Sequence, residues 1–173
     1  MNSVDTLTTI KDFIQKKIIE KNILMQLEET QNGPQYVNPY VEVCSLPHKN
    51  FLPQGFQVPF IVVMLDDEDD NGNENVYSIR LVFGAYGGGY YKDSNGSMTT
   101  VPDAKGYIDL LNLMDIVKQW LVTSSIINNK TVISKPYKKG MYNDENTWPY
   151  WYGYSTFSAA GVVENYLIHE NLI

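Results

Sequence analysis

Residues suited to covalent or metal chemistry are scarce in this sequence, which has one cysteine, Cys44, and two histidines, His48 and His169. A single cysteine excludes an intramolecular disulfide and a zinc site built on cysteines. Cys44 lies in an apolar stretch, so we interpret it as a small buried side chain rather than a nucleophile. No Walker A, G-x-S-x-G or H-E-x-x-H motif occurs. The sequence therefore predicts neither an enzyme nor a cofactor.

Positive charge is also scarce, with 13 Lys and Arg against 20 Asp and Glu, a net charge of −7. This balance argues against a protein that grips nucleic-acid phosphates. No apolar run approaches the roughly 18 residues of a membrane span. The first residues lack the basic start and apolar core of a signal peptide. We therefore expect an acidic, soluble, intracellular protein without a membrane partner.

Aromatic residues, in contrast, are abundant, with 13 Tyr and 3 Trp among 173 residues. Hydrophobic residues make up 43 % of the chain. That is enough for a single domain with its own core, which we expect to span 1–173. Tyr and Trp offer large, fairly rigid contact surfaces, so their excess indicates a surface that binds something.

Two segments have the apolar spacing of amphipathic helices. The first is 4–29, with Ser3 or Asp5 as its N-cap. The second is 104–123, capped by Asp103, and its apolar stripe is wider than one packing face needs. The second helix is therefore expected either to be covered on two sides or to offer part of its stripe to a partner.

The remaining regular segments are predicted strands at 36–44, 58–65, 76–83, 131–137 and 148–162. The unbroken apolar run 58–65 is typical of a strand buried on both faces. In the next strand one face carries alternate residues, namely Tyr77, Ile79, Leu81 and Phe83. We expect these two strands to form a hairpin, with loops at 45–57 and, long and mobile, at about 84–103. The fold class that follows is α+β, a mostly antiparallel sheet with two main helices packed on it.

The turn expected at 66–75 is strongly acidic. Asp67, Asp69, Asn71 and Gly72 match the first half of an EF-hand calcium loop. The match then fails, because Ser78 stands where the bidentate carboxylate belongs and the flanks are strands. Three interpretations stay open: a solvated hairpin tip, a weak calcium site, and a negative rim on an assembly.

The late strand is dense in aromatic residues. Tyr150, Tyr152 and Tyr154 share one face, and Trp151, Ser155 and Phe157 share the other. Core packing, a subunit interface and a sugar-stacking platform each fit this pattern. With the second helix, the strand supplies the interface candidates Leu113, Ile116, Val117, Trp120, Tyr150, Trp151, Tyr152 and Tyr154.

Two local patterns, DLLNLMDIV at 109–117 and WPYWYGY at 148–154, stand within a particular order of elements. That order is helix, strand, hairpin with acidic turn, variable loop, helix and aromatic strand. It resembles the small structural proteins of tailed bacteriophages and prophages of Gram-positive bacteria, in particular the tail terminator (tail completion, head–tail joining) family. The resemblance covers roughly residues 1–160.

The resemblance implies a structural protein that is not an enzyme. It implies a homo-oligomeric ring, commonly a hexamer, which caps the tail tube and offers a surface to the head connector. DNA would pass through the ring as cargo only, and an acidic lumen would let it slide. The place would be the virion tail, after synthesis in the cytoplasm of the bacterial host. The long loop would dock on a partner, with Tyr86, Tyr90 and Tyr91 as candidates.

A different class of function also fits the residues. The chain is then a monomeric binding module that uses its aromatic strand on glycans or its acidic loop for calcium. That alternative predicts a single-chain mass in solution, whereas the tail protein predicts a discrete assembly.

Overall fold

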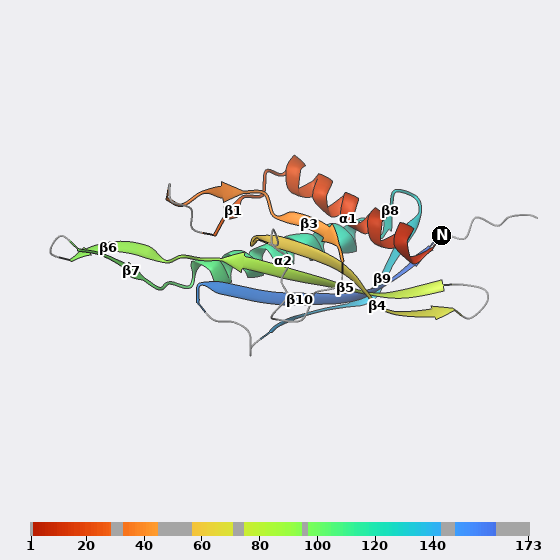
Figure 1. Cartoon of the computed structure of the whole chain (residues 1–173). Helices are drawn as coiled ribbons and strands as arrows, with labels where there is room; N and C mark the ends of the chain where they lie inside the picture. Colours follow the sequence, from red (N-terminus) through yellow and green to blue (C-terminus); the bar gives the residue numbers. More distant parts are fainter. Residues whose placement is uncertain are drawn as a thin grey trace, which may run out of the picture.

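The computed structural model describes residues 2–28, 33–44, 57–70, 75–94, 97–142 and 148–161. The chain is an α+β protein with two helices, α1 (Ser3–Glu20) and α2 (Lys105–Thr123). A mostly antiparallel sheet of six strands lies beneath them (Figure 1). Its order is β3 (Tyr40–Val43), β4 (Phe60–Asp70), β5 (Asn75–Tyr86), β10 (Tyr150–Gly161), β9 (Thr131–Met141) and β8 (Ile126–Ile127). The expected fold class is confirmed.

Only β3 and β4 run parallel; every other neighbouring pair in the sheet is antiparallel. Two small sheets accompany it, β1 (Met25–Gln26) with β2 (Tyr36–Val37), and β6 (Tyr90–Ser94) with β7 (Ser97–Val101). The β6–β7 hairpin extends from one end of the molecule, and the β4–β5 hairpin extends from the other (Figure 1). Neither helix in these ranges is long and apolar enough to cross a bilayer.

The main core lies between the helices and one face of the sheet. It contains the alternating residues predicted for β5, all nearly inaccessible to solvent: Tyr77, Ile79, Leu81 and Phe83. A second, smaller apolar cluster lies on the opposite face and contains Val58, Phe60, Val62, Val82 and Tyr86. Strand β4 contributes to both clusters, so the prediction that its apolar run is buried on both sides is confirmed.

The first helix is shorter than predicted, ending at Glu20 rather than near residue 29. Asn22 adopts a positive φ of 50°, the left-handed conformation that commonly terminates a helix. The apolar residues that follow continue the pattern by chance, because Met25 and Gln26 belong to β1. The predicted caps Ser3 and Asp5 are wrong: Asn2 is the N-cap, and its side chain accepts a hydrogen bond from the Asp5 N–H at 2.8 Å.

The second helix begins and ends close to its predicted bounds. Ala104 is the N-cap and makes no side-chain capping bond. Asp103 lies one residue earlier, and its Oδ1 accepts a hydrogen bond from the Lys105 N–H at 3.0 Å. The carboxylate predicted to cap this helix therefore does bind its first turn, although from outside the cap position.

The hairpin of β4 and β5 is confirmed, but its acidic segment is not a turn. Strand β4 continues to Asp70 and β5 starts at Asn75, so Asp66–Asp70 is an exposed strand with a bulge between Leu65 and Asp67. Polar residues extend a strand where its neighbour supplies a ladder of backbone hydrogen bonds, as β5 does here.

The loop predicted at 84–103 is also wrong in its secondary structure. Strand β5 runs on to Tyr86, and β6 and β7 pair as an antiparallel hairpin from Tyr90 to Val101. Glycine content concealed these strands; Gly89, with a φ of 75°, turns the chain between β5 and β6. The predictions for Asn71 and for both histidines fall outside the described residues, as does nearly all of the loop predicted at 45–57.

Candidate assembly surfaces

The sheet face opposite the helices is rich in tyrosine, and we call it the tyrosine face. Its members are Tyr86, Tyr142, Tyr150, Tyr152 and Tyr154. The rings contact one another and Phe60 rather than standing free. Tyr86 lies edge-on to Tyr150 at 5.5 Å, Tyr142 packs on Tyr154 at 5.0 Å, and Phe60 lies 6.2 Å from Tyr152. The predicted division of β10 into two aromatic faces is confirmed.

An arginine and an aspartate extend the tyrosine face toward the acidic strand. The Arg80 Nε donates to Asp66 Oδ1 and Oδ2 at 3.0 and 2.9 Å, and its Nη2 lies 2.9 Å from Oδ2. Its guanidinium lies over the Tyr154 ring at 5.5 Å. Hydrogen bonding to Tyr142 and to Asp66 raises the pKa of Arg80. No sequence pattern predicts this cluster, because it forms only when β4 pairs with β5.

A tyrosine at the other end of the face reaches a distant segment. The Tyr150 hydroxyl donates a hydrogen bond to Glu28, which follows β1. Burial, followed by this hydrogen bond, raises the pKa of Tyr150 well above its usual range. The phenol therefore stays a neutral donor, and it ties β10 to the chain beyond α1.

The interface candidates on α2 divide into two groups. Leu113 and Val117 are 1 % and 0 % exposed and belong to the main core. Ile116 and Trp120 are half-buried, so they retain surface for a partner. The wide apolar stripe thus serves mainly the chain's own packing. On β10, Trp151 faces the helices and lies edge-on to Tyr107 at 5.5 Å.

The metal candidates Asp67 and Asp69 are exposed residues of β4. Side chains two apart on a strand share a face, but this pair supplies only two carboxylates, whereas Ca²⁺ takes about six to eight oxygen ligands. Among the residues that the structure describes, no group of three or more His, Cys, Asp or Glu is arranged to hold a metal ion. An EF-hand-type arrangement is therefore not formed by the described part of this segment.

The β6–β7 hairpin, which we call the arm, carries the docking candidates Tyr90 and Tyr91. They are 53 % and 47 % exposed. Tyr86, predicted with them, is instead only 6 % exposed and lies on the tyrosine face. The three tyrosines fall within the segment predicted as one loop, but Tyr86 belongs to β5 and the other two belong to β6.

Close backbone contact holds Gly87, in the segment that leads from β5 into the arm, against α2. A Cβ added to Gly106 would lie 2.8 Å from both Cα and N of Gly87, and one added to Gly87 would lie 2.7 Å from the same atoms of Gly106. Only glycine at both positions permits this approach. The Gly87 N–H also donates to the Pro149 carbonyl at 2.9 Å, which fixes the segment to the start of β10.

Comparison with protein-family models and with curated protein sequences found no match to this chain.

Proposed function

We propose that this chain is a structural subunit that assembles with copies of itself. The observation that carries the proposal is the exposure of the arm. Tyr90 and Tyr91 are adjacent on β6, and successive side chains of a strand point to opposite faces. Both are about half exposed, so each face of the arm keeps aromatic surface that a partner can contact. A two-stranded hairpin is marginally stable by itself, and docking on another protein would stabilise it.

The assembly we propose is the ring of a phage tail terminator, the family that the order of elements resembles. The α+β fold agrees with that expectation, although it is shared by many unrelated proteins. In such a ring the arm of each subunit lies on a neighbouring copy. One flat face of the ring meets the tail tube, and the other meets the head connector. The net charge of −7 would let DNA pass through the centre without binding.

The glycan-binding alternative receives less support from the geometry. A sugar stacks on an aromatic ring whose face is open. On the tyrosine face, Tyr86 and Tyr150 pack edge to face, and Tyr154 contacts both Tyr142 and the guanidinium of Arg80. These rings are already engaged with neighbours in the same chain.

Absolute mass in solution tests the proposal. Light scattering after size exclusion, over a hundredfold range of protein concentration, should give a discrete multi-subunit species. The variant Tyr90→Ser with Tyr91→Ser should shift that species toward the monomer while the melting temperature stays within a few degrees.

A matched control alters two exposed apolar residues away from the arm. Val4 and Ile19 on α1 are 64 % and 60 % exposed, and their replacement by serine should leave the mass unchanged. A wild-type monomer at every concentration would contradict self-assembly. An arm variant that assembles as the wild type does would contradict the role of the arm.

A further inference from the structure

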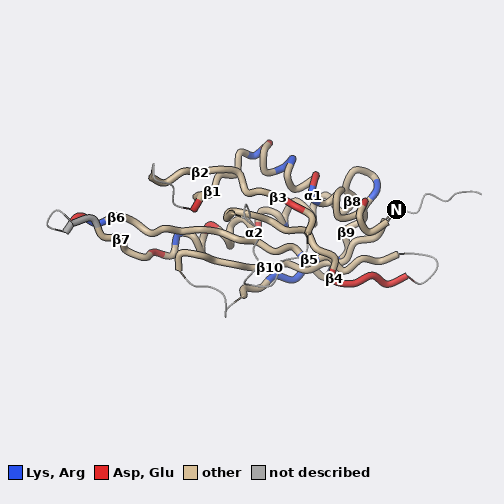
Figure 2. Tube along the Cα trace, in the orientation of Figure 1, with Lys and Arg blue, Asp and Glu red and all other residues tan. Residues whose placement is uncertain are grey.

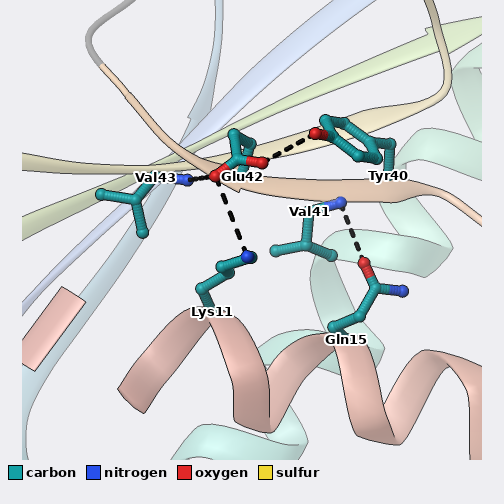
Figure 3. Close-up of polar contacts among 6 residues, drawn as sticks. All are labelled: Lys11, Gln15, Tyr40, Val41, Glu42 and Val43. Carbon is teal, nitrogen blue, oxygen red and sulfur yellow. Dashed lines mark hydrogen bonds and ion pairs between the residues drawn. The ribbon is translucent and has the colours of Figure 1, made fainter. Parts of the chain in front are cut away.

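One edge of the six-stranded sheet is closed by side chains. On β3, the Val41 and Val43 N–H groups do not bond to β4. The Val41 N–H donates to Gln15 Oε1 of α1 at 3.2 Å, and the Val43 N–H donates to Glu42 Oε1 at 3.0 Å (Figure 3). Lys11 lies 3.9 Å from the same carboxylate oxygen. These contacts occupy the donors that an incoming strand would need, so β3 is a blocked edge.

Two other edge segments have no described strand beside them. Strand β3 pairs with β4 only over Phe60–Val63, which leaves the outer edge of residues 64–69 without a neighbour in the described sheet. Strand β8 pairs with β9 only at Thr131 and Val132, which leaves the outer edge of residues 134–141 in the same condition. Unpaired edges of this kind accept another strand by backbone hydrogen bonding where the strand is regular. Strand β4 has a bulge between Leu65 and Asp67, and β9 has one between Ser134 and Lys138, where Pro136 has no N–H to donate.

The two segments carry opposite charge. The edge of β4 is acidic, as the red stretch at its end in Figure 2 shows, and Asp67 and Asp69 there are exposed. The edge of β9 is basic, and Lys135 and Lys138 there are exposed. Within the ranges that the structure describes, none of these four side chains forms an ion pair. We call the two segments the acidic edge (residues 64–69) and the basic edge (residues 134–141).

The acidic and basic edges overlap in level over residues 64–67 and 134–138, whereas Asp69 lies level with Val132, which pairs with β8. Asp67 is paired with Ser78, Ser78 with Ser158, and Ser158 with Ser134, so one rung joins the two edges. Three antiparallel pairings separate β4 from β9, and the two strands therefore run in opposite directions. A second copy placed beside the first in the same orientation presents its acidic edge antiparallel to the first copy's basic edge.

We propose that the acidic edge of one copy joins the basic edge of the next, so that the sheets continue from subunit to subunit. The proposal rests on the self-assembly proposed above and names its interface. Two acidic edges repel each other, and so do two basic edges, which disfavours a two-fold dimer through either. The head-to-tail contact that remains closes into a ring, or extends as a filament if the rotation does not close.

Charge reversal tests the interface. The acidic-edge variant carries Asp67→Lys and Asp69→Lys, and the basic-edge variant carries Lys135→Glu and Lys138→Glu. Each places like charges on both edges, so each alone should associate at least tenfold more weakly than the wild type at low salt. The difference should shrink in 1 M salt, where screening acts over about 3 Å.

Mixing the two variants gives the decisive result. In the mixture every contact between unlike copies again joins opposite charges, so an alternating assembly should form with at least half of the wild-type association constant. A chain carrying all four reversals should likewise assemble alone. Recovery of this kind cannot arise from misfolding of either variant.

The control and the contrary outcomes separate the two proposals. Asp12→Lys with Glu20→Lys makes the same charge change as the acidic-edge variant, but on the exposed side of α1, and should not alter association. The edge interface would be overturned if either edge variant assembles as the wild type does. It would also be overturned if the two variants do not associate when mixed. Self-assembly itself would stand in both cases. A wild-type monomer at all concentrations would overturn both.

Discussion

The contact between Gly87 and Gly106 allows a prediction in which two familiar effects oppose each other. Gly106 is the second residue of α2. Replacing glycine by alanine within a helix normally stabilises it by up to about 1 kcal/mol, and by less in the first turn. Helix propensity alone therefore predicts that Gly106→Ala stabilises the protein.

The packing predicts the reverse. The added Cβ would stand 2.8 Å from Cα and N of Gly87 and 2.8 Å from Cδ1 of Trp151. Reaching an ordinary contact of about 3.5 Å requires roughly 0.7 Å of movement. Two of the three contacts are backbone, and Gly87 is held by its hydrogen bond to Pro149. Overpacking of this kind costs about 1–3 kcal/mol, so the net change should be a loss of about 1–2 kcal/mol.

Thermal and urea unfolding measure the effect. For a chain of this length, a loss of about 1–2 kcal/mol lowers Tm by roughly 2–8 °C. Asn112→Ala, at an exposed position of the same helix, supplies the propensity gain without a clash and should leave Tm unchanged or slightly higher. A Gly106→Ala protein as stable as the wild type would show that Gly87 and Gly106 do not pack as closely as these distances indicate.

Further predictions concern the core, the blocked edge and the acidic strand. Phe157→Ala should lower the free energy of unfolding by about 3–5 kcal/mol, because its ring is buried and stacks on Tyr137 at 5.4 Å. Hydrogen bonds from Tyr40 and the Val43 N–H lower the pKa of Glu42. The unfolded state therefore binds more protons, and this stabilisation is present above about pH 4.3 and disappears as pH falls through the folded pKa. Urea unfolding between pH 3 and 7 should show a shallower acid dependence for Glu42→Gln; an unchanged slope would refute the assignment. Excess calcium should leave Tm unchanged, whereas a site held at 100 times its Kd would add about 2.7 kcal/mol.

Local patterns in the sequence were sufficient for much of the fold. The alternation that places Tyr77 and Phe83 on one face of β5 predicts a half-buried strand, because side chains alternate with a period of two. The unbroken run 58–65 predicts a strand buried on both faces, and β4 indeed joins both apolar clusters. Three-to-four spacing located both helices. These signals are local because each element must carry its own apolar face.

Other features depend on neighbours that sequence patterns do not identify. Asp66–Asp70 has the composition of a turn and forms a strand because β5 pairs with it. Gly-rich residues 87–89 concealed the arm because the strands beyond them are stabilised by pairing with each other. Helix α1 ends at Glu20 although apolar spacing continues, because Asn22 turns the chain toward β1.

The candidate surfaces show the same division most clearly. Sequence alone determined that the protein is acidic, rich in tyrosine and equipped with an aromatic strand whose two faces differ. Only the tertiary structure decided that Val117 is buried while Tyr90 is exposed, and that Asp67 shares a rung of the sheet with Ser134, beside Lys135. Burial and edge position depend on which strands become neighbours, and that order is fixed by long-range packing rather than by the residues adjacent in the chain.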